Sequence, residues 1–222
     1  MLAPRKRITK KDLKEDKLIT FYAQARNWIE NNSKIVFGAL AAIVIIVVAT
    51  VVISQNRQQA EKKASVEFAK AVRVYETGDY QQALTLFSSL VENYGSTDSG
   101  TMGRLYLAKC FYKNDDPVNA REQYQKFASS FDKSKHFRAS ALAGAASCLE
   151  AQEQYEQAAK EYEKVVKKYP DVPLASLYLL NAARCYTLAD SEEKAETLYQ
   201  KIVENYPESE EKDDALLLSS MI

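Results

Sequence analysis

Histidine and cysteine are scarce in this chain of 222 residues, which contains one histidine, His136, and three cysteines. The sequence also has no glycine-rich phosphate loop, no HExxH sequence and no paired His/Cys spacing. These are the patterns that mark nucleotide, metal and nucleophilic sites. His136 follows the polar stretch Asp132–Lys135, where solvation explains it. We therefore predict no enzyme activity, no cofactor and no metal site.

Glycine and proline are also few, at six and five residues, which favours a mostly helical chain with short turns. The formal net charge is zero, but the charges are unevenly distributed. Residues 1–34 carry nine basic and four acidic residues, so the remainder is acidic. Nucleic-acid-binding domains rely on a basic face for most of their affinity. The acidic main domain therefore predicts no nucleic-acid partner.

One long apolar run, Ile35–Ile53, contains no charged residue. A bilayer core of about 30 Å requires about 20 apolar residues in a helix. We predict a transmembrane helix over residues 35–53. A buried core helix is the first alternative, but such a helix is rarely apolar on every face. A cleaved signal peptide is the second, but 34 residues precede the run and no A-x-A-like site follows it.

The segment before the span, residues 1–34, is predicted to be a basic tail with an amphipathic helix at the membrane surface. Residues 1–11 show no apolar periodicity and are expected to be disordered. Leu18, Tyr22 and Ile29 then recur at helical spacing, and Trp28 suits the headgroup zone of a lipid bilayer. The basic bias of this tail predicts that the N-terminus is cytoplasmic and that the main domain lies on the other side.

A repeat dominates the main domain, predicted to cover residues 54–222. Its anchoring alanines, Ala83, Ala120, Ala158 and Ala195, are separated by 37, 38 and 37 residues. An aromatic residue follows each of them by four positions. A period of this size is typical of a solenoid of helix–turn–helix units. We predict an all-α fold with about four repeats, over residues 64–97, 101–132, 139–170 and 174–208. Residues 213–222 form a capping helix whose Leu216, Leu217 and Leu218 cover the open end.

The recurring order of small, tyrosine, small, aromatic and proline positions resembles the tetratricopeptide repeat, TPR. In the third unit these are Ala146, Tyr155, Ala158, Tyr162 and Pro170. The period exceeds the usual length of about 34 residues by about one helical turn. The whole plan of basic tail, single span and repeats is similar to the ancillary subunits of the Sec translocon. That resemblance implies a bacterial inner-membrane protein whose repeats face the periplasm and bind translocon or chaperone partners.

Each cysteine, Cys110, Cys148 and Cys185, stands two residues after the key alanine of a first helix. Neighbouring helices lie about 8–10 Å apart, which exceeds the Cα separation that a disulfide tolerates. A redox or metal cluster is the alternative interpretation. We predict three buried residues that fill tight helix contacts.

The resemblance also implies a concave groove lined by first-helix residues, which would bind a peptide segment or a membrane-associated protein. Carried onto this chain, the predicted lining is Phe68, Val72, Tyr75, Leu105, Lys109, Tyr112, Leu177, Arg184 and Leu188, with Ala143, Ser147 and Glu150 in the third repeat. An apolar patch with a charged rim is typical of a binding surface. Alternatively, these residues pack against Ser54–Lys70 or against a second copy of the chain.

These features together predict a membrane-anchored scaffold for protein–protein interaction, in contact with lipid through residues 35–53 and Trp28. The alternative is a structural, homo-oligomeric component of a cell-envelope complex. Between Ala39 and Glu76 the sequence contains neither proline nor glycine. The span is therefore expected to continue as one rigid helix into the first repeat.

Overall fold

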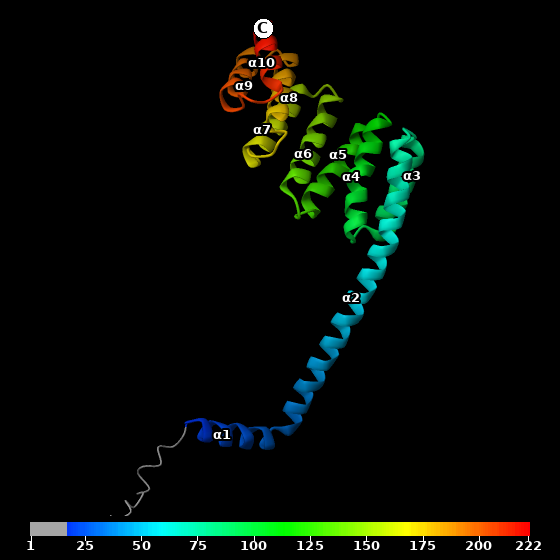
Figure 1. The fold of residues 1–222 in the computed structure, drawn as a ribbon, viewed down its shortest axis with the longest axis vertical. Coiled ribbons are helices and arrows are strands. Elements are labelled where there is room, and N and C mark those ends of the chain that lie inside the picture. The colour runs from blue at the N-terminus through cyan, green and yellow to red at the C-terminus, as the bar shows by residue number, and fades with distance from the viewer. Residues whose placement is uncertain (1–16) are drawn as a thin grey trace, which may run out of the picture. The chain divides into compact units, whose positions relative to one another are not determined.

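The computed structural model describes residues 17–222, which are helical with short connections and contain no strand (Figure 1). The predicted disorder of residues 1–11 lies outside the described residues, as does the tail up to residue 16. The chain divides into two units at Asn56 and Arg57, and each unit is described by itself.

The N-terminal unit contains α1 (Lys17–Asn31) and the beginning of α2 (Ser33–Glu76). The two helices are separated at Asn32, whose side-chain amide donates a hydrogen bond to the Trp28 carbonyl at 2.8 Å. Residues from Ile35 to Ile53 are almost all exposed, and α2 is the one helix in the described part that is long and apolar enough to cross a membrane, judged by length and composition. The helix has no break before Glu76, as predicted.

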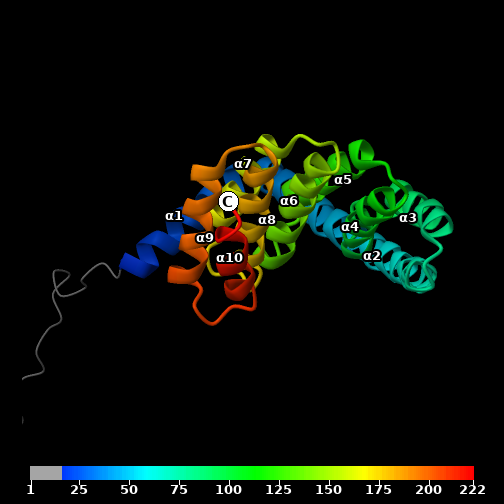
Figure 2. The same ribbon diagram turned by 90° about the horizontal axis from the view of Figure 1, so that it is seen from above.

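The second unit is a stack of helix pairs that lie side by side in chain order (Figures 1 and 2). The end of α2 pairs with α3 (Tyr80–Tyr94), because Ala64 and Ala71 share a core cluster with Ala83 and Phe87. Three further pairs and a last helix follow: α4 (Asp98–Lys113) with α5 (Pro117–Ser130), α6 (Lys135–Glu150) with α7 (Tyr155–Lys168), α8 (Ala175–Leu188) with α9 (Glu192–Asn205), and α10 (Glu211–Ser219). The predicted all-α solenoid of about four repeats with a terminal helix is confirmed.

Polar side chains fix where several of these helices begin. Asp79 caps α3 by accepting a hydrogen bond from the Gln82 amide at 2.9 Å. Asp116 caps α5 in the same way, and Pro117 occupies the first turn, where no amide donor is required. Glu61 of α2 accepts hydrogen bonds from the Asp98 amide at 2.8 Å and the Ser99 hydroxyl at 2.6 Å. This carboxylate therefore caps α4 and joins the first repeat to the second.

The repeat alanines are the points where the helices cross. Ala83, Ala120, Ala158 and Ala195 are fully buried. The aromatic residue one turn later, such as Tyr124 or Tyr162, fills the space beside each of them. A Cβ atom on Gly144 of α6 would lie 2.7 Å from Tyr124 Cζ, so only glycine fits at that crossing. These small residues set the close spacing of the pairs.

The last helix, α10, covers the end of the stack with only one of its faces. Ala215 is fully buried and Leu218 packs against the core, but Leu216 and Leu217 are 50% and 61% exposed. The prediction that all three leucines cover the end is therefore wrong for Leu216 and Leu217. Residues 215 and 218 share one face of a helix, and the two residues between them point elsewhere.

Candidate protein-binding surfaces

A chain of polar contacts links the first helices of three successive repeats. The Ser147 hydroxyl of α6 donates to the Tyr112 hydroxyl of α4 at 3.2 Å. Glu150, one turn further along α6, accepts a hydrogen bond from the Tyr162 hydroxyl at 3.3 Å and lies 3.9 Å from an Arg184 guanidinium nitrogen of α8. Burial is the main cause that raises the pKa of Tyr162. This tyrosine therefore stays protonated and remains a donor to Glu150.

Lys109 stands three residues before Tyr112 on α4. Its ammonium lies 4.9 Å from the centre of the Tyr106 ring, and partial burial lowers the pKa of Lys109. No carboxylate forms an ion pair with Lys109 among the described residues. A partly dehydrated cation without an anion is suited to receive a carboxylate or carbonyl oxygen from a partner.

The predicted aromatic residues pack on one another at the first repeat. Phe68 lies 5.5 Å from Tyr106 and 6.0 Å from Phe87, ring centre to ring centre. Tyr75 lies 5.4 Å from Tyr106 and 5.2 Å from Tyr80. Val72 is half-buried beside them. Tyr106 was missed by sequence reasoning, because it stands two residues before the key alanine and outside the set spaced by four.

Three of the predicted groove residues do not lie at exposed groove positions: Leu105, Leu177 and Leu188. Leu105 is 3% exposed and belongs to the core, so it is not available to a partner, and its substitution would test folding. Leu188 is 53% exposed and Leu177 partly exposed. In the repeat register, however, Leu180 and not Leu177 corresponds to Leu105, and Thr187 and not Leu188 corresponds to Tyr112. The repeat is longer than the usual tetratricopeptide period, and this made the equivalent residues of α8 hard to identify from the sequence.

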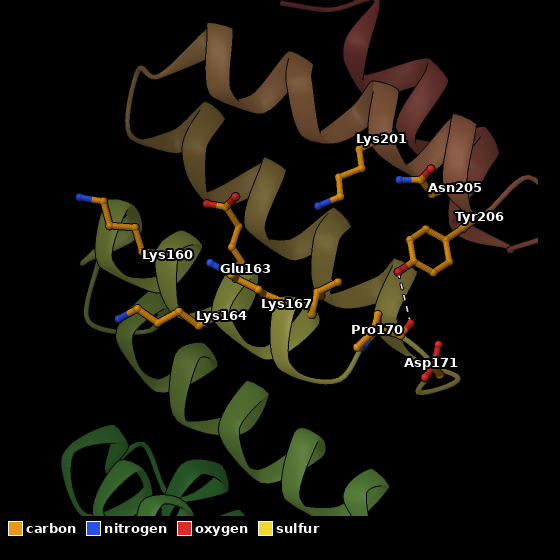
Figure 3. Close-up of a pocket in the computed structure, with 10 residues that line it drawn as sticks. Lys160, Glu163, Lys164, Lys167, Pro170, Asp171, Lys201, Asn205 and Tyr206 are labelled. Atoms are coloured by element: carbon orange, nitrogen blue, oxygen red, sulfur yellow. Dashed lines mark hydrogen bonds between the residues drawn. The ribbon is translucent and has the colours of Figure 1, made fainter.

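A cavity lies on a different surface, between α7 and α9 (Figure 3). It has a volume of about 900 Å³ and is lined by Lys160, Glu163, Lys164, Val166, Lys167, Pro170, Asp171, Lys201, Asn205 and Tyr206. The sequence analysis did not single out this region. A usable signal was present, because Lys164 and Lys201 are 37 residues apart and occupy equivalent repeat positions.

The three cysteines are fully buried and free, as predicted for packing residues. Burial raises the pKa of each thiol to about 12. The metal-ligating side chains of residues 17–222 form no cluster of three that could hold an ion. The thiols are therefore protonated at neutral pH and unreactive.

Stacked helix pairs with small residues at their crossings define an α-solenoid of the helical repeat class. The chain belongs to the tetratricopeptide repeat-like domain family, whose pattern matches residues 26–168. A second match, to the tetratricopeptide repeat, covers residues 137–210. A comparison with curated proteins finds no match.

Solved structures with similar folds come from Podosopora anserina. The nearly identical TPR-like repeats of a protein assigned as a kinesin light chain match with a TM-score of 0.54 and 20% identity, over 64% of this chain and 74% of that chain. A variant of those repeats with one substitution matches with a TM-score of 0.56 and 19% identity, over 68% and 77%. At this identity the similarity shows the fold alone.

Proposed function

We propose that this protein is a membrane-anchored scaffold that binds another protein through the first-helix face of its repeats. Tetratricopeptide repeats generally mediate protein–protein interaction. The observation that carries the proposal is the Lys109 ammonium, which is partly buried and has no ion-pair partner among the described residues. The exposed Arg184 guanidinium offers a second cation on α8. Its ion pair with Glu150 is long, at 3.9 Å, which leaves Arg184 able to contact a partner. Both cations suit an acidic or carbonyl-rich partner segment.

The proposed anchor is the span over residues 35–53. Its exposed apolar side chains are costly in water and favourable in lipid. Tyr22 and Trp28 of α1 are 69% and 58% exposed, which suits aromatic residues at a membrane interface. We propose residues 1–34 as the cytoplasmic tail and residues 54–222 as a periplasmic repeat domain at a bacterial inner membrane. Digestion of the repeat domain by protease added to intact spheroplasts tests this orientation.

The proposed partners are proteins at the same membrane, including a translocon or its chaperones, as the plan of the chain implies. A structural, homo-oligomeric role in a cell-envelope complex is the second candidate. It is favoured by the apolar side chains that α10 and the following residues expose, namely Leu216, Leu217, Met221 and Ile222.

Site-specific photo-crosslinking in cells tests the scaffold. A photoreactive amino acid at Lys109 or Arg184 should capture a different protein, identified by mass spectrometry. The same group at exposed Glu92 of α3 provides the control and should not capture that protein. Lys109→Glu should weaken the capture from Arg184 without unfolding the repeats, because Lys109 is not in the core. If Lys109 yields only adducts between copies of the chain, the scaffold is wrong and the structural role is favoured.

A further inference from the structure

The cavity between α7 and α9 is a basic groove formed by side chains at regular spacing. Lys160, Lys164 and Lys167 follow one another by four and three residues along α7, and Lys201 of α9 lines the same cavity (Figure 3). We call this cavity the lysine groove. Residues three and four apart lie on the same face of a helix, so the three α7 lysines form a row.

The carboxylates of the lysine groove are already engaged. Glu163 accepts a hydrogen bond from the Tyr186 hydroxyl at 2.7 Å, and Asp171 lies 3.9 Å from the Lys135 ammonium. Lys164 pairs with Glu161 outside the groove at 2.7 Å, and Lys160 shares Glu156 with Lys194. Lys167 and Lys201 have no ion pair among the described residues. Glu163 keeps its negative charge, because the Tyr186 hydroxyl is neutral, but Lys167 and Lys201 outnumber it and leave the groove with net positive charge.

The spacing of these charges fits a chain of carboxylates better than one compact anion. Lys160 and Lys164 are separated by about 6 Å along the helix axis. Alternate side chains of an extended peptide are separated by about 6.6 Å on one face. A single phosphate or lipid headgroup would need donors that converge on one point, and these lysines are spread along α7. The groove also presents the partly exposed Tyr206 ring, whose hydroxyl donates to the Pro170 carbonyl at 3.4 Å.

We propose that the lysine groove binds an extended acidic segment of a partner protein, with carboxylates at alternate positions facing Lys160 and Lys164 and further carboxylates facing Lys167 and Lys201. This proposal rests on the scaffold function and names the chemistry of one partner. It adds a second docking surface, on the second helices of the repeats, to the first-helix face.

Peptide binding to the full chain in neutral-lipid nanodiscs tests the proposal. The probe is a fluorescein-labelled peptide of alternating Glu and Ser, and the uncharged control peptide alternates Gln and Ser. Fluorescence anisotropy should show that only the acidic peptide binds and that added salt weakens binding. Lys167→Glu with Lys201→Glu turns two attractive contacts into repulsive ones, so it should weaken binding about fivefold or more. Lys62→Glu with Lys63→Glu changes the net charge equally on α2 and should have little effect.

Three outcomes would overturn the proposal. Equal binding of the two peptides would show that the negative charge of the peptide does not contribute to binding. Equal losses in the Lys167/Lys201 and Lys62/Lys63 variants would show a response to net charge and not to the groove. Loss of peptide binding in nanodiscs with anionic lipid would assign the groove to lipid headgroups. Photo-crosslinking from Lys109 does not depend on these readouts, so the scaffold function can fail or hold separately.

Discussion

One backbone position recurs in every repeat turn with a left-handed conformation. Gly78 has φ +84°, and the residues that follow it by 37, 75 and 112 positions, Asp115, Glu153 and Asp190, have φ of 57°, 59° and 52°. Only in the first repeat does the sequence place a glycine at this position. Asp tolerates this conformation better than Glu, because its short side chain can form local hydrogen bonds. Glu153 is therefore the most strained residue of the four.

Replacing Glu153 with glycine should stabilise the protein. A Cβ atom costs about 1–2 kcal/mol in the left-handed region, and the extra flexibility of unfolded glycine offsets part of that gain. We expect Glu153→Gly to raise the free energy of unfolding by about 0.5–1 kcal/mol, and Gly78→Ala to lower it by a similar amount. Urea unfolding followed by circular dichroism measures both. Lys160→Gly, in the exposed interior of α7, is the control and should destabilise by about 1 kcal/mol.

The buried thiols should make stability depend on alkaline pH. Burial raises the pKa of Cys148 from 9.0 to about 12. The folded chain therefore holds the proton more tightly than the unfolded chain, so this contribution is complete below pH 9 and is lost as pH rises toward 12. We expect Tm to fall across this window, and to fall less steeply in Cys148→Ala. Identical slopes of Tm against pH for the two proteins would contradict the prediction. A constant difference in Tm caused by the lost sulfur atom does not affect this comparison.

At the scale of helices, the sequence predicts which residues share a face but not which side chains meet across non-adjacent helices. The crossing alanines and the cysteines were found because helical spacing fixes their orientation. The lysine groove was missed because it depends on the distance between α7 and α9 and on which carboxylates are already paired. Leu105 was misplaced for a related reason. Leu105 shares a core cluster with Tyr124 of α5, and this packing between the two helices of one repeat is not visible in the leucine pattern within α4.

The helix α2 gives a prediction at the same scale. It continues from the span into the first repeat, with Asn56–Lys63 in the middle of the connection. If the helix persists in solution, these amides should exchange with deuterium as slowly as the amides of Ala64–Glu76, because their hydrogen bonds are equally continuous. Hydrogen-exchange mass spectrometry in nanodiscs measures this, with the non-helical residues Asp132–Lys133 as the fast reference. Fast exchange at Asn56–Lys63 would show that the connection is a flexible tether.

For the whole molecule, the scaffold needs both an anchor and a binding surface, and the two can be separated experimentally. Val44 and Val48 lie one turn apart within the span, and both are exposed. A lysine at the centre of a membrane helix costs about 2.5–3.5 kcal/mol. Val44→Lys with Val48→Lys should therefore release the chain from membranes under alkaline carbonate extraction, and Ser54→Lys with Gln58→Lys, beyond the span, should not.

The released variant also tests why the repeats are attached to an anchor. Its lysine groove is unchanged, so it should bind the Glu-Ser peptide in detergent as the parent does. In cells, however, photo-crosslinking from Lys109 should be lost, because a membrane partner is no longer held at high local concentration. Crosslinking that persists after release would mean that the repeats find their partner without the membrane. Retention of the double-lysine variant in the membrane would instead show that residues 35–53 are not the anchor.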